Sequence, residues 1–524
     1  MKILFNKYIS KDKLFLTFGS IFMLIAVLSF VFFNINDEKL LSSLNITKAD
    51  YDNILQSKQQ TSKVLVNDVY FNGFKLIKDI DSDSWFYSLI DDSNNAYSPK
   101  ISFNKISNDI KIASLQKEIN PKNIEKNIPI KFIAYNDNEY YLFNVICTTL
   151  PILSINEGKI YLFDNRKNSS RREFSSYVDY RERGHYSIHY PKKNFSINLK
   201  NYSPGKNRRK VSTTLLGMPE KSKWHLYSAF VDPEKIRQVF SAKLWKDCCS
   251  YNNSFWVDNG YEYKSIELFI DNKYWGLYYL GYPLDEKQMK LRTDEYLYKR
   301  SSPAEDYKLV AGKFKNFPTI DINKYFSLLK LENTTKNVQE LYDKTEIGNA
   351  IDFWLFINLI QGVDNFCFEY STVTNLFVTQ KVTNNGTLRF IFTPWDFDGT
   401  WGHTFDHPEK EKDFPPKVNS VPKAYEQIFV IYYLLYNNDE NIKALIKNRY
   451  AELRKTFWKA EYLLSLIDSY EKDIFDSGAY IRDKQRWPKA TYMKNEKIKL
   501  SDFKKYVLKR LHYMDLYVEE VTKN

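Results

Sequence analysis

The sequence predicts an α+β protein attached to a membrane by one N-terminal helix. Three features of the chain lead to this fold class: an uncharged apolar stretch near the N-terminus, a series of short β-branched and aromatic runs, and a C-terminal part whose apolar residues have helical spacing. Hydrophobic residues make up 43% of the 524 residues and aromatic residues 17%, which is enough material for packed cores.

The apolar stretch covers residues 14–33 and contains no charged residue. A helix of this length crosses about 30 Å of hydrocarbon. Four lysines precede it, while Asp37 and Glu38 follow it, so the positive-inside rule places residues 1–13 in the cytoplasm and the remainder outside. A cleaved signal peptide is the alternative, but its apolar region is usually shorter and ends in small residues. We therefore expect a single-pass anchor in the cell membrane.

The first part of the chain after the anchor divides into two segments. Residues 34–60 are polar and predict a stalk or a short helix. Residues 61–145 contain strand-like runs separated by polar turns, and Asn72-Gly73 between two apolar runs is a hairpin signal. We expect a small β-rich domain over 61–145.

Residues 146–520 predict a second, larger domain of mixed structure with a helical C-terminal part. Strand patterns occur at 195–199, 266–270 and 388–392, and helical patterns occur at 232–246, at 350–360 and over most of 424–521.

Charge and cysteine content narrow the class of function. The net charge of +12 is spread among 64 acidic residues, and the densest basic run, 207–210, has no recognition helix or zinc module beside it. We predict no nucleic-acid partner; a basic exterior suits anionic lipid or cell-wall polymer. Four cysteines are too few for a disulfide scaffold in a chain of this length.

A basic segment at 181–199 is the first of three with the residues for chemistry. Arg183, Gly184 and Ser187 precede Lys192 and Lys193, which lead into a strand. A lysine that enters a buried strand can direct its ammonium group to a phosphate oxygen. The alternative is a pair of exposed lysines that protect an edge strand from aggregation.

The second segment, 351–364, is an apolar helix that ends near Gly362 and brings Asp364 and Asn365 into a loop. A carboxylate at this place can accept a proton from an attacking hydroxyl group. The alternative is that Asp364 and Asn365 only form turn hydrogen bonds.

The third segment, 388–402, is a strand that leads to Asp396 and Asp398 on either side of Phe397. Carboxylate oxygens suit a hard divalent cation, and Mg²⁺ held in this way usually also binds nucleotide phosphates. Asn375, beside another strand, has an amide oxygen for the same ion. A turn stabilised by the aspartates is the alternative. His403 and His407 have no suitably spaced third ligand, so we do not expect zinc.

In this order the segments resemble the spore coat protein H-like (CotH) kinase family. The resemblance runs from Leu150 to about Gly402, and its most characteristic string is Pro-Trp-Asp-Phe-Asp at 394–398. The matching text also includes the basic segment. The other matching segments are 215–218, 224–226, Asp232 with Ile236 and Arg237, and the strand pair at 266–279.

The resemblance implies a reduced, atypical protein-kinase-like fold without the usual glycine-rich loop. It also implies that ATP and Mg²⁺ are used to phosphorylate Ser or Thr of secreted, surface or spore coat proteins of a bacterium. Carried over residue by residue, it implies these roles: catalysis by Asp364, Lys193 and Arg183; nucleotide binding by Lys192, Lys193, Arg183 and Ser187; metal binding by Asp396, Asn375 and Asp398.

Other functions stay open. Gln238 replaces an asparagine of the family, and Tyr282 lies at or near the place of a family glutamate. These departures favour a catalytically weak or inactive scaffold that binds a coat or cell-wall component. A polysaccharide-binding or polysaccharide-processing protein would suit the aromatic richness, but no facing pair of catalytic carboxylates is recognisable. Nucleotide affinity separates a kinase from a scaffold.

Overall fold

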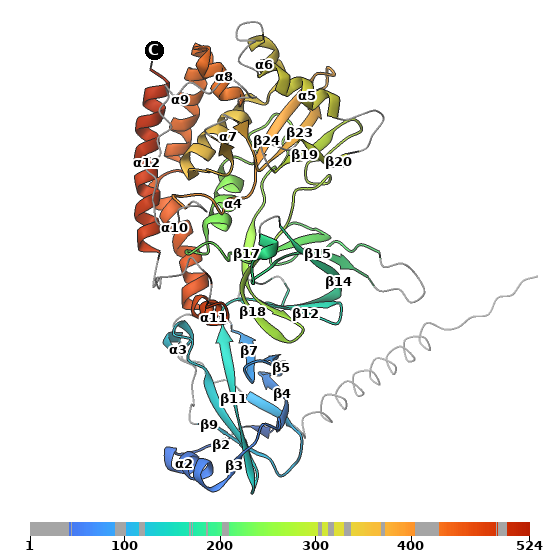
Figure 1. Cartoon of the computed structure of the whole chain (residues 1–524), viewed down its shortest axis with the longest axis vertical. Helices are drawn as coiled ribbons and strands as arrows, with labels where there is room; N and C mark the ends of the chain where they lie inside the picture. Colours follow the sequence, from blue (N-terminus) through green and yellow to red (C-terminus); the bar gives the residue numbers. More distant parts are fainter. Residues whose placement is uncertain are drawn as a thin grey trace, which may run out of the picture. The chain divides into compact units, whose positions relative to one another are not determined.

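The structure, a computed structural model, confirms a mixed α+β architecture and forms two compact units (Figure 1). It describes residues 41–42, 44–89, 101–114, 121–166, 169, 171–184, 187–201, 209–301, 306–312, 319–329, 337–367, 372–403, 429–488, 490 and 500–523. The predicted anchor, 14–33, lies outside these residues. Among the described helices, none has both the length and the apolar character needed to span a membrane.

The first unit takes up most of the chain before Cys147 and consists mainly of two sheets. One sheet has the strand order β1-β8-β4-β5, and the other has the order β2-β9-β10-β11-β7-β6 with β3 beside β11. The bounds of its strands and helices are β1 (Leu41–Ser42), β2 (Leu44–Asn45), α2 (Lys48–Ser57), β3 (Gln59–Gln60), β4 (Val66–Phe71), β5 (Phe74–Lys75), β6 (Ile77–Asp79), β7 (Ser84–Ser88), β8 (Ile101–Lys105), β9 (Lys111–Ser114), α3 (Pro121–Glu125), β10 (Ile130–Tyr135) and β11 (Glu139–Thr148).

Local sequence explains two features of the first unit. Asn72 and Gly73 both have positive φ and join β4 to β5, as an Asn-Gly hairpin turn requires. Helix α2 begins at a capping box in which Thr47 and Asp50 bond each other's backbone, and it falls within the segment where a stalk or short helix is expected.

The second unit begins with a closed barrel of seven strands in the order β12-β13-β14-β15-β16-β18-β17. Parallel pairing of β12 with β17 closes the barrel and leaves no free edge. Alternation in the sequence builds its interior: Phe195, Ile197 and Leu199 of β15 are buried in the core. The strands are β12 (Ile152–Asn156), β13 (Lys159–Phe163), β14 (Glu173–Arg183), β15 (Asn194–Lys200), β16 (Lys223–Tyr227), β17 (Tyr263–Ile270) and β18 (Lys273–Gly281).

A second sheet and a set of helices complete this unit (Figure 1). The sheet has the order β20-β19-β23-β24, and helix α7, buried along most of its length, packs on β24. Helix α12 packs against α7, α9 and α10. The bounds are α4 (Arg237–Cys248), β19 (Tyr296–Arg300), β20 (Lys308–Gly312), α5 (Thr319–Leu328), α6 (Val338–Lys344), α7 (Ile347–Ile360), β21 (Phe366–Cys367), β22 (Thr372–Val373), β23 (Leu376–Val382), β24 (Leu388–Pro394), α8 (Val430–Tyr436), α9 (Glu440–Lys455), α10 (Ala460–Glu471), α11 (Ala479–Arg486) and α12 (Ser501–Val521).

The start of α4 differs from the helix predicted over 232–246. The helix begins at Arg237 because Asp232 forms a turn ahead of it, accepting hydrogen bonds from the backbone N–H groups of Glu234 and Arg237 at 3.1 and 2.7 Å. An aspartate that bonds nearby backbone in this way competes with helix formation.

Candidate functional site

Two aspartates follow strand β24 in a loop whose backbone is held from both sides. Trp395 donates its N–H to the carbonyl of Asn375 at 2.8 Å, and Phe397 donates its N–H to Gln238 Oε1 at 2.5 Å. The Phe397 side chain is fully buried and stacks on Tyr261, whereas Asp396 and Asp398 are half-buried. We call residues 395–398 the acidic loop.

Asp364 meets Asn375 beside the acidic loop. Helix α7 ends at Ile360, and the positive φ of 52° at its C-cap Gln361 turns the chain away from the helix axis. Asn375 Nδ2 then donates to Asp364 Oδ2 at 2.8 Å. The structure therefore brings together Asp364, Asn375, Asp396 and Asp398, which come from three separate segments.

The buried neighbour Asn365 fixes this meeting point. Its Nδ2 donates to the carbonyl oxygens of Trp395, at 2.6 Å, and of Asn375, at 3.2 Å. These bonds join residues 10 and 30 positions apart in the chain, so the Asn365 side chain makes tertiary contacts and not the local turn bonds of the alternative interpretation. The Asp364 carboxylate accepts its hydrogen bond from Asn375.

The carboxylates in this cluster oppose one another electrostatically. The surrounding protein partly removes water from the Asp364 carboxyl, although its side chain keeps exposed surface. This desolvation and the charge of Asp396 raise the pKa of Asp364 to about 7. Burial and the charges of Asp396, Asp364 and Asp232 hold the pKa of Asp398 well above its usual range. Concentrated negative charge of this kind favours a bound cation or proton.

Among the described residues, no group of three or more His, Cys, Asp or Glu side chains is placed to hold a metal ion alone. A cation at the acidic loop would need the amide oxygen of Asn375 or oxygens from a ligand in addition to the aspartates. This donor set fits Mg²⁺, which binds through one or two carboxylates together with substrate phosphates. His403 is buried in this unit, and His407 lies outside the described residues.

The basic residues predicted from the barrel segment lie in different environments. Arg183 has its guanidinium carbon 5.8 Å from the centre of the Trp395 ring and so reaches the acidic loop. Lys192 is completely buried, where its Nζ donates to the carbonyls of Ser228 and Leu277 and to Asp483, and burial lowers its pKa to about 8.

Lys193 and Ser187 form local contacts. Lys193 Nζ donates to the carbonyl of Ile188 at 2.6 Å and lies 4.0 Å from Glu182. Ser187 Oγ accepts a hydrogen bond from Asn194 at 3.2 Å. A Cβ at Gly184 would lie 1.8 Å from this Oγ, so only glycine fits there.

Several residues beside the site carried no assigned role in the sequence analysis. Arg237 pairs with the buried Asp232 at 2.6 Å and donates to the carbonyl of Thr400, while Gln238 supports the acidic loop. The signal that could have revealed them is the pair of polar residues opening an otherwise buried helix. Lys299, whose Nζ lies 5.5 Å from the centre of the Trp395 ring, had no sequence signal.

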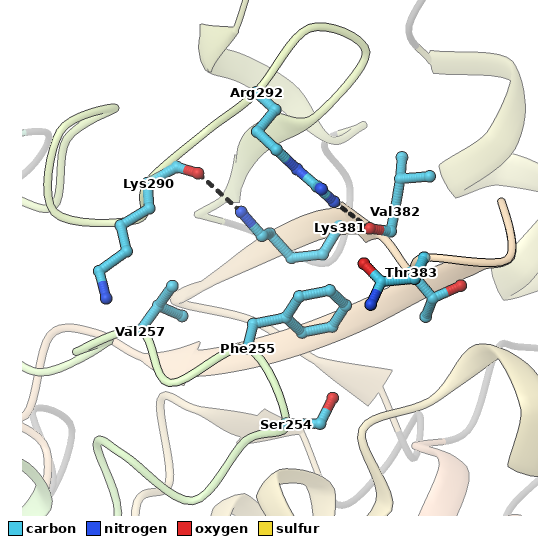
Figure 2. Close-up of a pocket in the computed structure, with 9 residues that line it drawn as sticks. Ser254, Phe255, Val257, Lys290, Arg292, Lys381, Val382 and Thr383 are labelled. Carbon is cyan, nitrogen blue, oxygen red and sulfur yellow. Dashed lines mark hydrogen bonds between the residues drawn. The ribbon is translucent and has the colours of Figure 1, made fainter.

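A separate cavity of about 360 Å³ lies beside β23 (Figure 2). Three basic side chains line it, but each is already bonded: Lys381 and Arg292 to the buried Glu295, and Lys290 to the carbonyl of Trp256. These contacts account for the charges without a ligand, so we place the chemistry at the acidic loop.

The second unit thus combines a closed barrel, a helical part and a group of acidic residues from separate segments. The CotH kinase protein family matches residues 180–514, more than half of the chain. This chain therefore belongs to the CotH kinase protein family. The search of the curated proteins found no match.

Proposed function

We propose that this chain is a protein kinase of the CotH type that transfers the γ-phosphoryl group of ATP to Ser or Thr hydroxyls of secreted or surface proteins. Family membership supports a kinase-related function and nucleotide use. The observation that carries the proposal is the 2.8 Å contact of Asp364 with Asn375 beside Asp396 and Asp398.

The residues present suit the demands of phosphoryl transfer, which depends on positioning and charge neutralisation. The acceptor oxygen forms a bond to the γ-phosphorus, the bond from that phosphorus to the bridging oxygen breaks, and ADP leaves. Asp364 accepts the proton of the acceptor hydroxyl and then releases it to water. Its 2.8 Å hydrogen bond from Asn375 orients the carboxylate for this role.

Asp396, Asp398 and the amide oxygen of Asn375 would hold Mg²⁺. The ion would neutralise charge on the phosphate oxygens. The raised pKa of Asp398 agrees with this assignment, because the cluster has more negative charge than its protein surroundings neutralise.

The cellular location of the protein is part of the same proposal. Residues 14–33 would anchor the chain in the cell membrane with residues 1–13 in the cytoplasm, so that the kinase unit faces secreted, cell-surface or spore coat proteins.

A phosphate-transfer assay with the full-length protein in detergent tests the proposal. The protein should transfer radiolabelled phosphate from ATP to itself or to surface-protein extract when Mg²⁺ is present. Asp396→Ala should lower the rate by at least about 100-fold, the scale expected for a residue that stabilises transition-state charge. The exposed, salt-bridged Asp502→Ala is the control and should act like the wild type. Equal labelling by wild type and Asp396→Ala would refute the proposal.

The environments of the two lysines favour one second candidate, a scaffold without catalysis. Lys192 is bonded to Asp483 and Lys193 to the carbonyl of Ile188, so both lysines already have partners within the protein. A ligand that binds the folded state raises its apparent stability. A scaffold would show no thermal shift at millimolar Mg-ATP, whereas a kinase would show one.

A further inference from the structure

A group of basic side chains gathers on the barrel and the neighbouring sheet, close to the acidic loop. Arg183 ends β14, Lys223 lies on β16 and Lys299 lies on β19. The charges of these three residues all act on His225 of β16 and, together with burial, hold its pKa well below the usual range. We call Arg183, Lys223, His225 and Lys299 the basic face.

Trp395 joins the basic face to the acidic loop. Lys299 Nζ is 5.5 Å and the Arg183 guanidinium carbon 5.8 Å from the centre of its ring, and the His225 ring meets it edge-on at 5.9 Å. These distances are typical of cation–π and aromatic contacts, and such contacts hold the side chains near one ring. The next residue in the chain is Asp396, and the charges of Arg183 and Asp396 both act on the same neighbour, Tyr263.

Polar atoms beneath the basic face lack partners. Ser196 lies directly across from His225 in the β15–β16 ladder. Within the described part of the chain, neither Ser196 Oγ nor His225 Nδ1 has a hydrogen-bond partner, although the two residues are only 4% and 5% exposed. Unpaired buried polar atoms are rare because they are costly, and at a native site they call for an explanation such as a ligand.

The basic face also remains reachable. Arg183 and Lys299 are half-buried and keep exposed surface, in contrast to Lys192, which is enclosed with Asp483. Anionic oxygens would be attracted to the positive charges of the basic face, while a cation would be attracted to the acidic loop. A polyphosphate with its divalent cation carries both charges.

We propose that Lys299, assisted by Arg183, is the phosphate-binding cation of a nucleoside di- or triphosphate site, with His225 and Ser196 lining it. The inference rests on the proposed function, because it names the residues that hold the nucleotide of that reaction. It places the phosphates between the basic face and the acidic loop, and assigns Lys192 to the support of the fold.

Calorimetric titration of the full-length protein in detergent tests this assignment. The titrants are adenosine, ADP and a non-hydrolysable ATP analogue, each with Mg²⁺. Lys299→Met should weaken binding of the ATP analogue by about 10- to 100-fold, the loss expected for a charge-assisted hydrogen bond. Adenosine affinity should not change, and Lys299→Arg should restore most of the ATP-analogue affinity. Lys287→Met, which removes a 77% exposed lysine, is the matched control.

Arg183→Met gives a second measurement if Lys299→Met does not fold. Wild-type affinity for the ATP analogue in both Met variants would overturn the inference, as would an equal loss for adenosine or a wild-type protein that binds no nucleotide. Phosphate transfer is assayed separately. Nucleotide binding through Lys299 without transfer would refute the proposed kinase and keep this inference, whereas transfer unaffected in both Met variants would refute the inference alone.

Discussion

Asp364 and Asn365 are neighbours in the chain, but their side chains make different contacts. Asp364 keeps exposed surface and is bonded by Asn375, whereas Asn365 is fully buried and bonded to two backbone carbonyls. Both residues follow the left-handed turn at Gln361 that ends helix α7. The proposed proton acceptor is thus followed in the chain by an amide that holds the neighbouring backbone segments together.

We expect Asn365→Ala to lower both stability and activity. The substitution leaves the carbonyls of Trp395 and Asn375 without the donor that they now share, which should cost about 1–3 kcal/mol of unfolding free energy. Denaturant unfolding measures this loss, and the exposed Asn448→Ala on α9 is the control. An unchanged unfolding free energy would show that Asn365 does not hold the loop.

At the scale of elements, helix α11 is tied to the barrel by buried charges. Lys192 before β15 bonds Asp483 of α11 at 2.6 Å, and Arg482 of the same helix bonds Glu267 of β17. Lys235 adds a contact to Asp483 at 3.4 Å. Breaking one partner of a buried pair leaves an uncompensated charge, so such a network is costly to disturb.

We expect Lys192→Met to destabilise the protein by about 3 kcal/mol while leaving the KM for ATP nearly unchanged. The pKa of Lys192 is about 8 in the folded state and close to the ordinary lysine value in the unfolded state. Between these values the unfolded state binds more protons, so this lysine makes the wild type gain stability as pH rises from about 8 to 10.

Unfolding free energies of wild type and Lys192→Met at pH 7.5, 8.5 and 9.5 measure this effect. The wild-type advantage should grow with pH over that range. A difference in unfolding free energy that does not change with pH would contradict the lowered pKa of Lys192. A large increase in the KM for ATP would show that Lys192 contributes to nucleotide binding.

At the scale of the whole molecule, the chain forms two compact units, and the acidic loop and basic face both belong to the second. The first unit is built of sheets with a core of aromatic side chains that includes Trp85, Phe103, Phe132 and Phe143. Nothing in the proposed reaction requires residues of the first unit.

We expect the full chain to stay in the membrane fraction after high-salt and alkaline washing, because a 20-residue apolar helix inserts stably. Deletion of 14–33 should release it, and protease added to intact cells freed of their wall should cleave the second unit. Substitutions of exposed Arg and Lys residues serve as controls and should leave the chain in the membrane fraction. Release of the intact chain by salt alone would contradict the anchor.

The sequence by itself determined the α+β class, the hairpin at Asn72 and Gly73, the strands at 195–199 and 388–392, and the CotH resemblance. These follow from local periodicity, turn chemistry and an ordered set of short motifs, all of which depend on residues close in the chain. The roles of Asp364, Asn375 and Asp396 stay predictions, although the structure brings these residues to one place.

Only the tertiary structure decided which lysine lies near the acidic loop. Lys192 and Lys193 are adjacent in the chain, yet Lys192 is buried and bonded to Asp483, whereas Lys193 is bonded to the nearby carbonyl of Ile188. Lys299 comes near Trp395 because β19 pairs with β23, so that Lys299 lies across from Phe377. Pairing between distant strands leaves no local pattern, and for that reason sequence spacing could not reveal it.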